Sequence, residues 1–410
     1  MNKTLICVLS ETRASKLSWP SFKHNVIDSL KADLALCISV PDDYNYSDPF
    51  WQFAKYRWTT KEFADWGSAL DEAQISACKG ALVSSVDWRT LLSIQDNWLG
   101  GVIESNAKRA GSGAILLFFR WLLVKHLLNE GILDRYDRFI ITRSDFIWPL
   151  PHPPLDILTE QHIWIPDGES YGGITDRHAV LSKQNIIDYL SVTDLILKDT
   201  ENLKVQLKGV QKLNLESYIA TALKKNGAYN LIQFFPYAMY TARECLGKTS
   251  WSTGVWSEEL GYHIKYPSEF EFARQLSEVV ETLDDWRKIF TRNSGRGFKS
   301  RVLTKEGMRI ALIGQQLGVL DDDLWDDGII MELTIDFIQD KGMLYLESSQ
   351  FGALTRQLVG HVKLVETNNG CFKLRSARNN GFFVINPKKT LQMDAVNYSE
   401  FRFKNRYLRL

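Results

Sequence analysis

The chain has 410 residues, 45% of them hydrophobic and 24% charged, which is typical of a soluble globular protein and too long for one average domain. Lys plus Arg and Asp plus Glu both total 49, so no net positive charge favours nucleic acid as a partner. The five cysteines are scattered and never form a Cys-x-x-Cys pair, which argues against a disulfide framework and a zinc site. We therefore expect a cytoplasmic protein of two or three domains.

The N-terminal segment predicts a strand, a helix and a second strand. Residues 5–10 are predicted as a strand whose apolar run, 5–9, is too short for a signal peptide. Residues 21–31 carry apolar side chains at helical spacing, and the mainly apolar residues 33–40 predict the second strand. This order predicts parallel strands joined by a right-handed crossover. Residues 41–110 show no pattern that we can organise. No window approaches the ~18 apolar residues of a membrane span, so none is expected.

The middle of the chain continues as alternating helices and strands. Residues 113–130 are apolar on nearly every side and end at Gly131, which predicts a helix buried between layers. The further predicted elements are strands at 139–142, 162–166 and 231–237, and helices at 182–190, 215–225 and 270–290.

The pattern changes after residues 294–300. From there short apolar strands alternate with turn signals such as the Asn-Asn-Gly sequences at 368–370 and 379–381. We predict two domains: residues 1–295 as an α/β domain with a Rossmann-type, mainly parallel sheet flanked by helices, and residues 300–410 as a β-rich accessory domain. In open parallel sheets ligands bind beyond the carboxyl ends of the strands.

Charged residues follow two of the predicted strands. Ser10 ends the first and Arg13 follows it, with no glycine-rich dinucleotide or phosphate-loop motif behind. Arg143, Ser144 and Asp145 follow the strand at 139–142. A carboxylate at such a strand end commonly holds a divalent cation, but Asp145 is equally explained as a turn residue that pairs with Arg143.

A second polar cluster follows the strand at 162–166. Asp167 and Asp176 flank the glycine pair Gly172 and Gly173, and the absence of a Cβ at such a pair permits a close backbone approach to a ligand. A solvated loop without function is the alternative interpretation of this cluster.

Together these segments, DRFIITRSDFIW and IWIPDGESYGGITDRHAVLS, resemble GT-A-type nucleotide-sugar-dependent glycosyltransferases that build bacterial and viral polysaccharides. Such enzymes carry a strand ending in Asp-x-Asp, or a reduced Arg-x-Asp form, and then a Gly-Gly-x-x-Asp-Arg loop. A later helix opening with an acidic residue is matched by Glu216 in NLES, and the YTARECLGKTSW and YHIKYPSEFEFA stretches are also similar. The resemblance covers about residues 4–275.

The resemblance implies a role for individual residues. Asp145 matches the last aspartate of the Asp-x-Asp motif, which holds Mn²⁺ or Mg²⁺ on the donor diphosphate, and His263 is a candidate late metal ligand. Arg143 replaces the first aspartate, which leaves fewer carboxylates for a metal and lets Arg143 share the neutralisation. The implied nucleotide-sugar-binding residues are Ser10, Arg13, Arg143, Ser144, Asp145, Gly172, Gly173, Arg243, Lys248 and Lys265. The candidate catalytic residues are Asp176, Glu216 and Asp167.

The resemblance therefore predicts a glycosyltransferase of polysaccharide biosynthesis, with a nucleotide-sugar donor and a glycan or lipid-linked acceptor. The alternative is a non-catalytic carbohydrate-binding protein whose glycosyltransferase domain is degenerate, which the reduced Arg-Ser-Asp motif permits. A nucleotidyltransferase would need a glycine-rich, basic signature after the first strand, and the sequence SETRAS has none.

Overall fold

A computed structural model describes residues 3–79, 86–168, 170–244, 253–278 and 280–292, and beyond them the strands of the C-terminal part. The chain divides into two compact units, each described by itself below. The first unit comprises Met1–Gly168 and Gly173–Leu283, and the second comprises Glu169–Gly172 and Asp284–Leu410. The predicted boundary at 295–300 lies partly outside the described residues and stays a prediction.

The first unit contains a seven-stranded sheet in the order β10-β8-β9-β6-β1-β2-β3. All its pairings are parallel except those of β9 with β6 and β8, so the predicted mainly parallel sheet is confirmed. In chain order the strands are β1 (Thr4–Ser10), β2 (Asp33–Val40), β3 (Tyr56–Lys61), β6 (Arg138–Thr142), β8 (Ile163–Asp167), β9 (Ala179–Ser182) and β10 (Ile232–Pro236).

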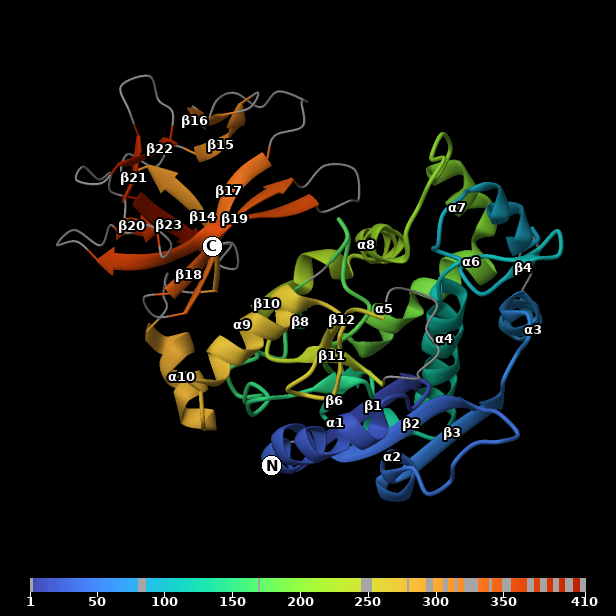
Figure 1. The fold of residues 1–410 in the computed structure, drawn as a ribbon. Helices are drawn as coiled ribbons and strands as arrows, with labels where there is room; N and C mark the ends of the chain where they lie inside the picture. The colour runs from blue at the N-terminus through green and yellow to red at the C-terminus, as the bar shows by residue number, and fades with distance from the viewer. Residues whose placement is uncertain are drawn as a thin grey trace. The chain divides into compact units, whose positions relative to one another are not determined.

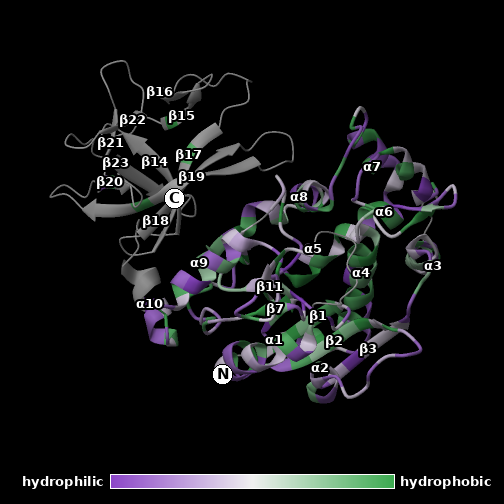
Figure 2. Cartoon of the chain, in the orientation of Figure 1, coloured by the Kyte–Doolittle hydropathy of each residue, from purple (hydrophilic) through white to green (hydrophobic). Residues whose placement is uncertain are grey.

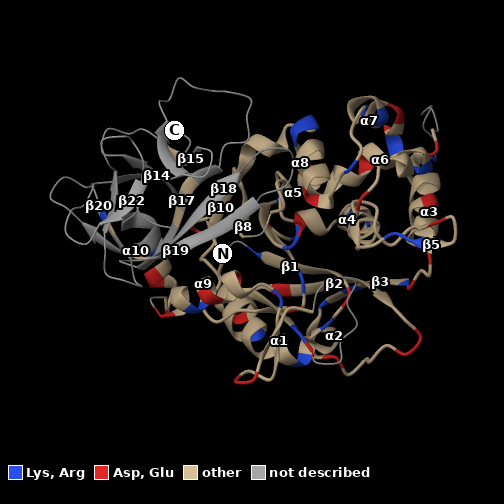
Figure 3. Cartoon of the chain, turned by 45° about the horizontal axis from the view of Figure 1, so that its top comes forward, with Lys and Arg blue, Asp and Glu red and all other residues tan. Residues whose placement is uncertain are grey.

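Helices cover both faces of this sheet. The helices are α1 (Ser15–Phe22), α2 (Pro49–Phe53), α3 (Trp66–Cys78), α4 (Gly113–Asn129), α5 (Ile186–Leu190), α6 (Asp194–Lys198), α7 (Thr200–Gln206), α8 (Leu215–Lys225) and α9 (Pro267–Ser277). Helices α3, α4 and α5 lie on one side of β1 and β2, and α1 and α2 lie on the other (Figures 1 and 3).

The core of this unit follows from the alternation of side chains along its strands. Leu5, Cys7 and Leu9 are buried in one cluster with residues of α3, α4 and α8, whereas the intervening Ile6 and Val8 are buried on the opposite face. Figure 2 shows the hydrophobic residues gathered in α4 and the neighbouring strands. Between Thr4 at its start and Ser10 at its end, β1 is apolar on both faces, so the polar residues that follow Leu9 are all at or beyond its carboxyl end.

A smaller antiparallel sheet of four strands, in the order β12-β13-β11-β7, stands beyond the end of β6. Its strands are β7 (Phe146–Ile147), β11 (Tyr240–Arg243), β12 (Val255–Ser257) and β13 (Tyr262–Ile264). None of these four strands was predicted from the sequence. Strands of two to four residues are too short to show the alternation that reveals a strand in a sequence.

Several sequence-based boundaries differ from the structure. Residues 21–31 are the end of α1 and a π-helix at Lys23–Asp28, and the predicted helix at 270–290 is wrong, because α9 and α10 (Leu283–Arg292) are separate helices. Residues 41–110 contain α2, α3 and β3, which the sequence analysis missed. Aspartates begin both of these helices: the Asp48 side chain accepts a hydrogen bond from the Phe50 amide, and Asp65 accepts one from Gly67.

The described strands of the second unit form a ten-stranded antiparallel sheet, which confirms the β-rich character predicted for this part. Its strands are β14 (Phe298–Thr304), β15 (Arg309–Ile313), β16 (Gln316–Leu320), β17 (Met331–Ile338), β18 (Lys341–Ser348), β19 (Thr355–Glu366), β20 (Phe372–Ser376), β21 (Phe382–Ile385), β22 (Leu391–Asp394) and β23 (Phe401–Asn405). A two-stranded hairpin, β4 (Ile103–Glu104) and β5 (Ala107–Lys108), belongs to the first unit. Among the described residues, no helix combines the length and apolar character of a membrane span.

Candidate functional site

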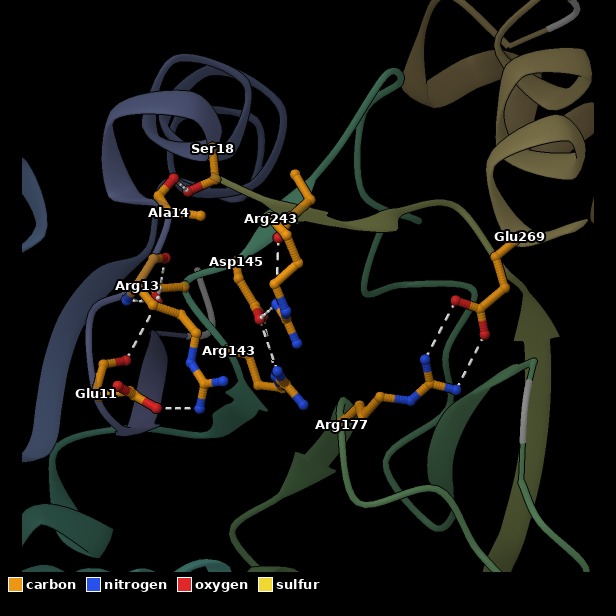
Figure 4. A network of polar contacts seen from close by, with 11 residues as sticks. Glu11, Arg13, Ala14, Ser18, Arg143, Asp145, Arg177, Arg243 and Glu269 are labelled. Carbon is orange, nitrogen blue, oxygen red and sulfur yellow. Dashed lines mark hydrogen bonds and ion pairs between the residues drawn. The ribbon is translucent and has the colours of Figure 1, made fainter. Parts of the chain in front are cut away.

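The Asp145 carboxylate lies between two arginine side chains. Arg143 donates to both of its oxygens, from Nε to Oδ1 at 2.9 Å and from Nη2 to Oδ2 at 2.6 Å, and Arg243 Nη1 donates to Oδ2 as well (Figure 4). Asp145 is fully buried, whereas the Arg143 side chain is 18% exposed. Burial alone would raise the pKa of Asp145, but the two guanidinium groups outweigh it and hold that pKa well below its ordinary value.

The small sheet brings Arg243 to this position from 98 residues away. Strand β11 pairs with β7 directly after Asp145, and the Ala242 amide donates to the Asp145 carbonyl at 3.0 Å. The Lys265 amide in turn donates to the Thr241 carbonyl, which places the residue after β13 at the same end of the sheet. Three basic residues from distant segments thus gather around one carboxylate.

Lys265 is influenced by the positive charge of this cluster. Burial lowers the pKa of Lys265 to about 7, and the neighbouring charges of Arg143 and Arg243 act in the same direction. Burial also lowers the pKa of Arg243. The single negative charge of Asp145 therefore does not balance the positive charges of Arg143, Arg243 and Lys265. The cluster keeps an excess of positive charge, which is suited to binding an anion.

Ser144 connects this cluster to the loop that follows β1. The buried Ser144 hydroxyl accepts from the Arg13 amide at 2.9 Å, and it lies 3.1 Å from the Arg13 carbonyl and 3.2 Å from that of Glu11. Ser10 and Ala14 bracket the loop with φ values of 73° and 52°, a left-handed conformation that is uncommon for residues other than glycine. The Arg13 side chain pairs with Glu11 and contributes to the lowered pKa of Asp145.

The glycine-rich loop is docked on the first turn of α8. A Cβ on Gly173 would lie 2.1 Å from the carbonyl carbon and oxygen of Glu216, so only glycine fits this contact. The next residue, Ile174, donates its amide to the same Glu216 carbonyl at 3.0 Å. Asn214 caps the helix by accepting from the Ser217 amide at 2.8 Å, so the side chain of Glu216 is not required as the N-cap.

Glu216 and Asp176 form the acidic part of the site. Burial raises the pKa of Glu216 to about 7, and the negative charge of Asp176 acts in the same direction against the opposing charges of Arg177 and Lys265. Asp176 also interacts with Arg143, raising the pKa of that arginine. The acidic pair and the basic cluster are therefore close enough to influence one another. A carboxyl group whose pKa is about 7 is well matched to general-base catalysis at neutral pH.

A buried ion pair that sequence analysis missed adjoins Asp176. Arg177 donates to both carboxylate oxygens of Glu269 on α9, at 3.2 and 3.0 Å, and both side chains are about 4% exposed (Figure 4). The Arg177 guanidinium also lies over the rings of Tyr237 and Tyr266, at 5.4 and 4.9 Å from their centroids. In the sequence, the charged Asp-Arg-His residues after the glycine pair were the signal that could have pointed to Arg177. Nothing in them identifies Glu269 as its partner.

Two buried histidines connect the β6 strand end to the glycine-rich loop. His152 Nδ1 must donate to the Pro153 carbonyl at 2.7 Å, so its Nε2 accepts from His178 Nε2 at 3.4 Å. His178 Nδ1 then accepts from the Thr142 hydroxyl at 3.0 Å. This direction of donation requires two neutral rings, and burial lowers the pKa of His152 to about 4 and that of His178 well below its ordinary value.

The structure thus brings most of the predicted site residues into one region, but not all of them. Arg13, Arg143, Asp145, Arg243 and Lys265 form the basic cluster. Asp167 ends β8, which is separated from β6 by β9.

The remaining predicted residues have different surroundings. His263 pairs with Arg243 across β13 and β11 and packs against Trp256. Gly172 has a φ of 78°. Lys248 lies outside the described residues. Within the described part of the chain, no group of three or more His, Cys, Asp or Glu side chains is arranged to hold a metal ion.

Comparison with known proteins shows a distant structural likeness. No protein-family model matches the chain, and no curated protein matches it. Among solved structures, mouse xyloside xylosyltransferase 1 in its apo form is similar over 57% of this chain and 85% of that protein, with 9% sequence identity and a TM-score of 0.30. At this identity and TM-score the likeness supports no functional conclusion.

Proposed function

We propose that this protein is a glycosyltransferase that moves a sugar from a nucleotide diphosphate donor to a hydroxyl group of a glycan or lipid-linked acceptor. The observation that carries the proposal is that basic and acidic side chains lie beside one another beyond the ends of β1 and β6. Arg143, Arg243 and Lys265 provide excess positive charge, and Glu216 with Asp176 provides carboxylates beside it. This location agrees with the general position of ligand sites in open parallel sheets.

The chemistry of sugar transfer requires both kinds of group. As the bond between the anomeric carbon and the diphosphate oxygen breaks, its electron pair leaves with the diphosphate, and the basic side chains stabilise the growing negative charge. The acceptor oxygen forms the new bond to the anomeric carbon and loses its proton to a carboxylate. We assign that proton to Glu216, because its pKa of about 7 lets it accept a proton near neutral pH, and assign Asp176 to contact with the sugar or acceptor.

The proposal is tested by measuring release of the nucleotide from UDP-, GDP-, dTDP- and CMP-linked sugars by the full chain. We expect slow hydrolysis of at least one donor in the absence of acceptor, and hydrolysis that is roughly 10²–10⁴-fold slower in a Glu216→Gln variant. Binding of a donor without turnover, in the presence of a panel of glycan acceptors, would instead favour a non-catalytic carbohydrate-binding protein. Absence of both binding and turnover would reject the proposal.

A further inference from the structure

The Asp145 carboxylate is poorly suited to hold a divalent cation. A Mg²⁺ or Mn²⁺ ion requires oxygen lone pairs that face it, and such sites usually contain more than one carboxylate or a ligand phosphate. Both oxygens of Asp145 instead accept hydrogen bonds from guanidinium groups. The positive charges of Arg143, Arg243 and Arg13 attract this carboxylate and would repel a metal cation.

The same arginines retain donors for a different ligand. A guanidinium group has five N–H donors. Arg143 uses two of them on Asp145, and Arg243 uses its Nη1 on Asp145 and on the Ala242 carbonyl. Arg243 is only 4% exposed, so water does not reach its Nε freely. Within the described residues this buried Nε has no hydrogen-bond partner.

An adjacent histidine has a similar unused atom. His263 faces Arg243 across β13 and β11, and its buried Nδ1 also has no hydrogen-bond partner in the described part of the chain. Buried polar atoms without partners are costly, and two of them on paired residues indicate a place where a polar ligand completes the hydrogen bonding. An oxyanion with several acceptor oxygens meets this requirement, whereas a metal cation does not meet the requirement of Arg243.

We infer that Asp145 is a positioning residue that holds Arg143 and Arg243 as a paired anion clamp, and that this clamp, with Lys265, binds the donor diphosphate without a divalent cation. The inference rests on the proposed function for the identity of the ligand. The carboxylate offsets the repulsion between the two guanidinium groups and orients their remaining N–H groups. Arginine suits this task because its planar donors match phosphate oxygens in pairs.

Isothermal titration calorimetry of the full chain with inorganic pyrophosphate in EDTA tests the clamp directly. We expect binding in EDTA, and a roughly 10- to 100-fold weaker affinity for Arg143→Gln and for Arg243→Gln, since each removes charged hydrogen bonds. Arg135→Gln is the matched control, because Arg135 is an exposed arginine just before the other end of β6. An equal loss of affinity in the control would contradict the assignment.

Addition of excess Mg²⁺ or Mn²⁺ distinguishes the clamp from a metal site. The clamp predicts that pyrophosphate affinity stays the same or falls, because the metal sequesters free pyrophosphate and adds positive charge to a positive site. Binding that appears only with the metal, or under neither condition, overturns the inference.

The positioning role of Asp145 has its own measurement. Asp145→Asn keeps the side-chain shape but removes the charge, and we expect weaker pyrophosphate binding in EDTA. Because Asp145 acts through Arg243, the loss should be smaller when Arg243→Gln is already present. Strictly additive losses, or wild-type affinity of Asp145→Asn in EDTA, would remove the positioning role.

The outcomes also separate this inference from the proposed function. Pyrophosphate binding in EDTA without turnover of any nucleotide sugar supports the clamp and contradicts the transferase. Sugar transfer that depends on Mn²⁺ or Mg²⁺, with no pyrophosphate binding in EDTA, supports the transferase and contradicts the clamp.

Discussion

Glu216 combines three properties expected of a base in sugar transfer. It is at the second position of α8, it is half-buried, and its pKa is raised to about 7, first by burial and then by the charge of Asp176. The neighbouring Arg177 and Lys265 limit this rise, so the carboxylate form is still available at neutral pH. The position of Glu216 thus sets the pH at which the proposed reaction would begin.

A pH profile checks this role. Because the base must be deprotonated, kcat/KM for donor turnover should fall as the pH decreases below about 7. Glu216→Gln cannot accept a proton, so we expect kcat to fall by roughly 10²–10⁴-fold and the acidic limb of the profile to disappear. Glu201→Gln on the exposed surface of α7 serves as the control and should leave the profile unchanged. An unaltered acidic limb in Glu216→Gln would assign the base elsewhere.

At the same residue scale, the sequence predicted the strand end that Asp145 follows but not the contacts of the Asp145 carboxylate. The apolar run that ends in Arg-Ser-Asp correctly marked the carboxyl end of β6, and of the two interpretations of Asp145, the pairing with Arg143 is present. The contact of Asp145 with Arg243 could not be predicted from the sequence, because it depends on the pairing of β11 with the two-residue strand β7. The buried partner of Arg177 was equally inaccessible, since Glu269 is on a helix 92 residues later.

The contact between the glycine-rich loop and α8 is the element-scale feature that places Asp176 near Glu216. Because the Gly173 contact is with backbone atoms of Glu216, a side chain there cannot be accommodated by rotating a neighbour. The Gly-Gly sequence identified a close approach, but sequence analysis assigned it to a ligand, whereas Gly173 approaches the helix.

Gly173→Ala should therefore separate the loop from α8 and reduce both stability and donor turnover. Gly227→Ala, just beyond the other end of α8, is a matched control because its added Cβ meets open space and incurs only the cost of a left-handed φ, about 1–2 kcal/mol. Chemical denaturation and kcat measured on both variants check the prediction. Equal losses of stability with full activity in both would show that the loop contact does not organise the site.

The histidine pair is a second connection between elements, and it is sensitive to acid. Both rings are neutral when folded, and their pKa values lie below the ordinary 6.5, at about 4 for His152. The folded protein thus binds fewer protons than the unfolded chain below pH ~6.5. The contribution of the two histidines to the free energy of unfolding is therefore fully present above that pH. It decreases toward pH 4, by up to ~1.4 kcal/mol per pH unit for each histidine.

A His178→Asn variant tests this connection. Asparagine keeps an acceptor near the Thr142 hydroxyl but does not titrate, so the free energy of unfolding should depend less on pH between 7 and 5 than in the wild-type protein. His24→Asn, at an exposed position, should retain the wild-type dependence. Urea denaturation at a series of pH values provides the comparison, and identical slopes for all three proteins would rule out the histidine pair as the source of acid sensitivity.

Element prediction succeeded where side-chain periodicity was strong and failed where it was interrupted. The limits of β2 and α8 agree with the sequence analysis, because long apolar patterns end at clear breaks. The helix expected at 270–290 combined α9 with α10, since acidic amphipathic spacing continues through the interval between them. The four short strands around Arg243 carried too little pattern to be found.

At the scale of the whole molecule, a mainly parallel sheet and a small antiparallel sheet combine to build the site. The parallel sheet supplies the ends of β1 and β6, and the small sheet supplies Arg243 and Lys265. The near-zero net charge of the chain conceals this local excess of positive charge. Charge composition therefore argued against a polyanion such as nucleic acid, while allowing a local site for one phosphorylated ligand.

The central claim is that one site binds the donor diphosphate with Arg243 and activates the acceptor with Glu216. Steady-state kinetics of nucleotide release, with the donor that the wild-type protein turns over, tests it most directly. We expect Arg243→Gln chiefly to raise KM, Glu216→Gln chiefly to lower kcat, and Arg135→Gln to match the wild type. Turnover that is the same in all four proteins would contradict the account.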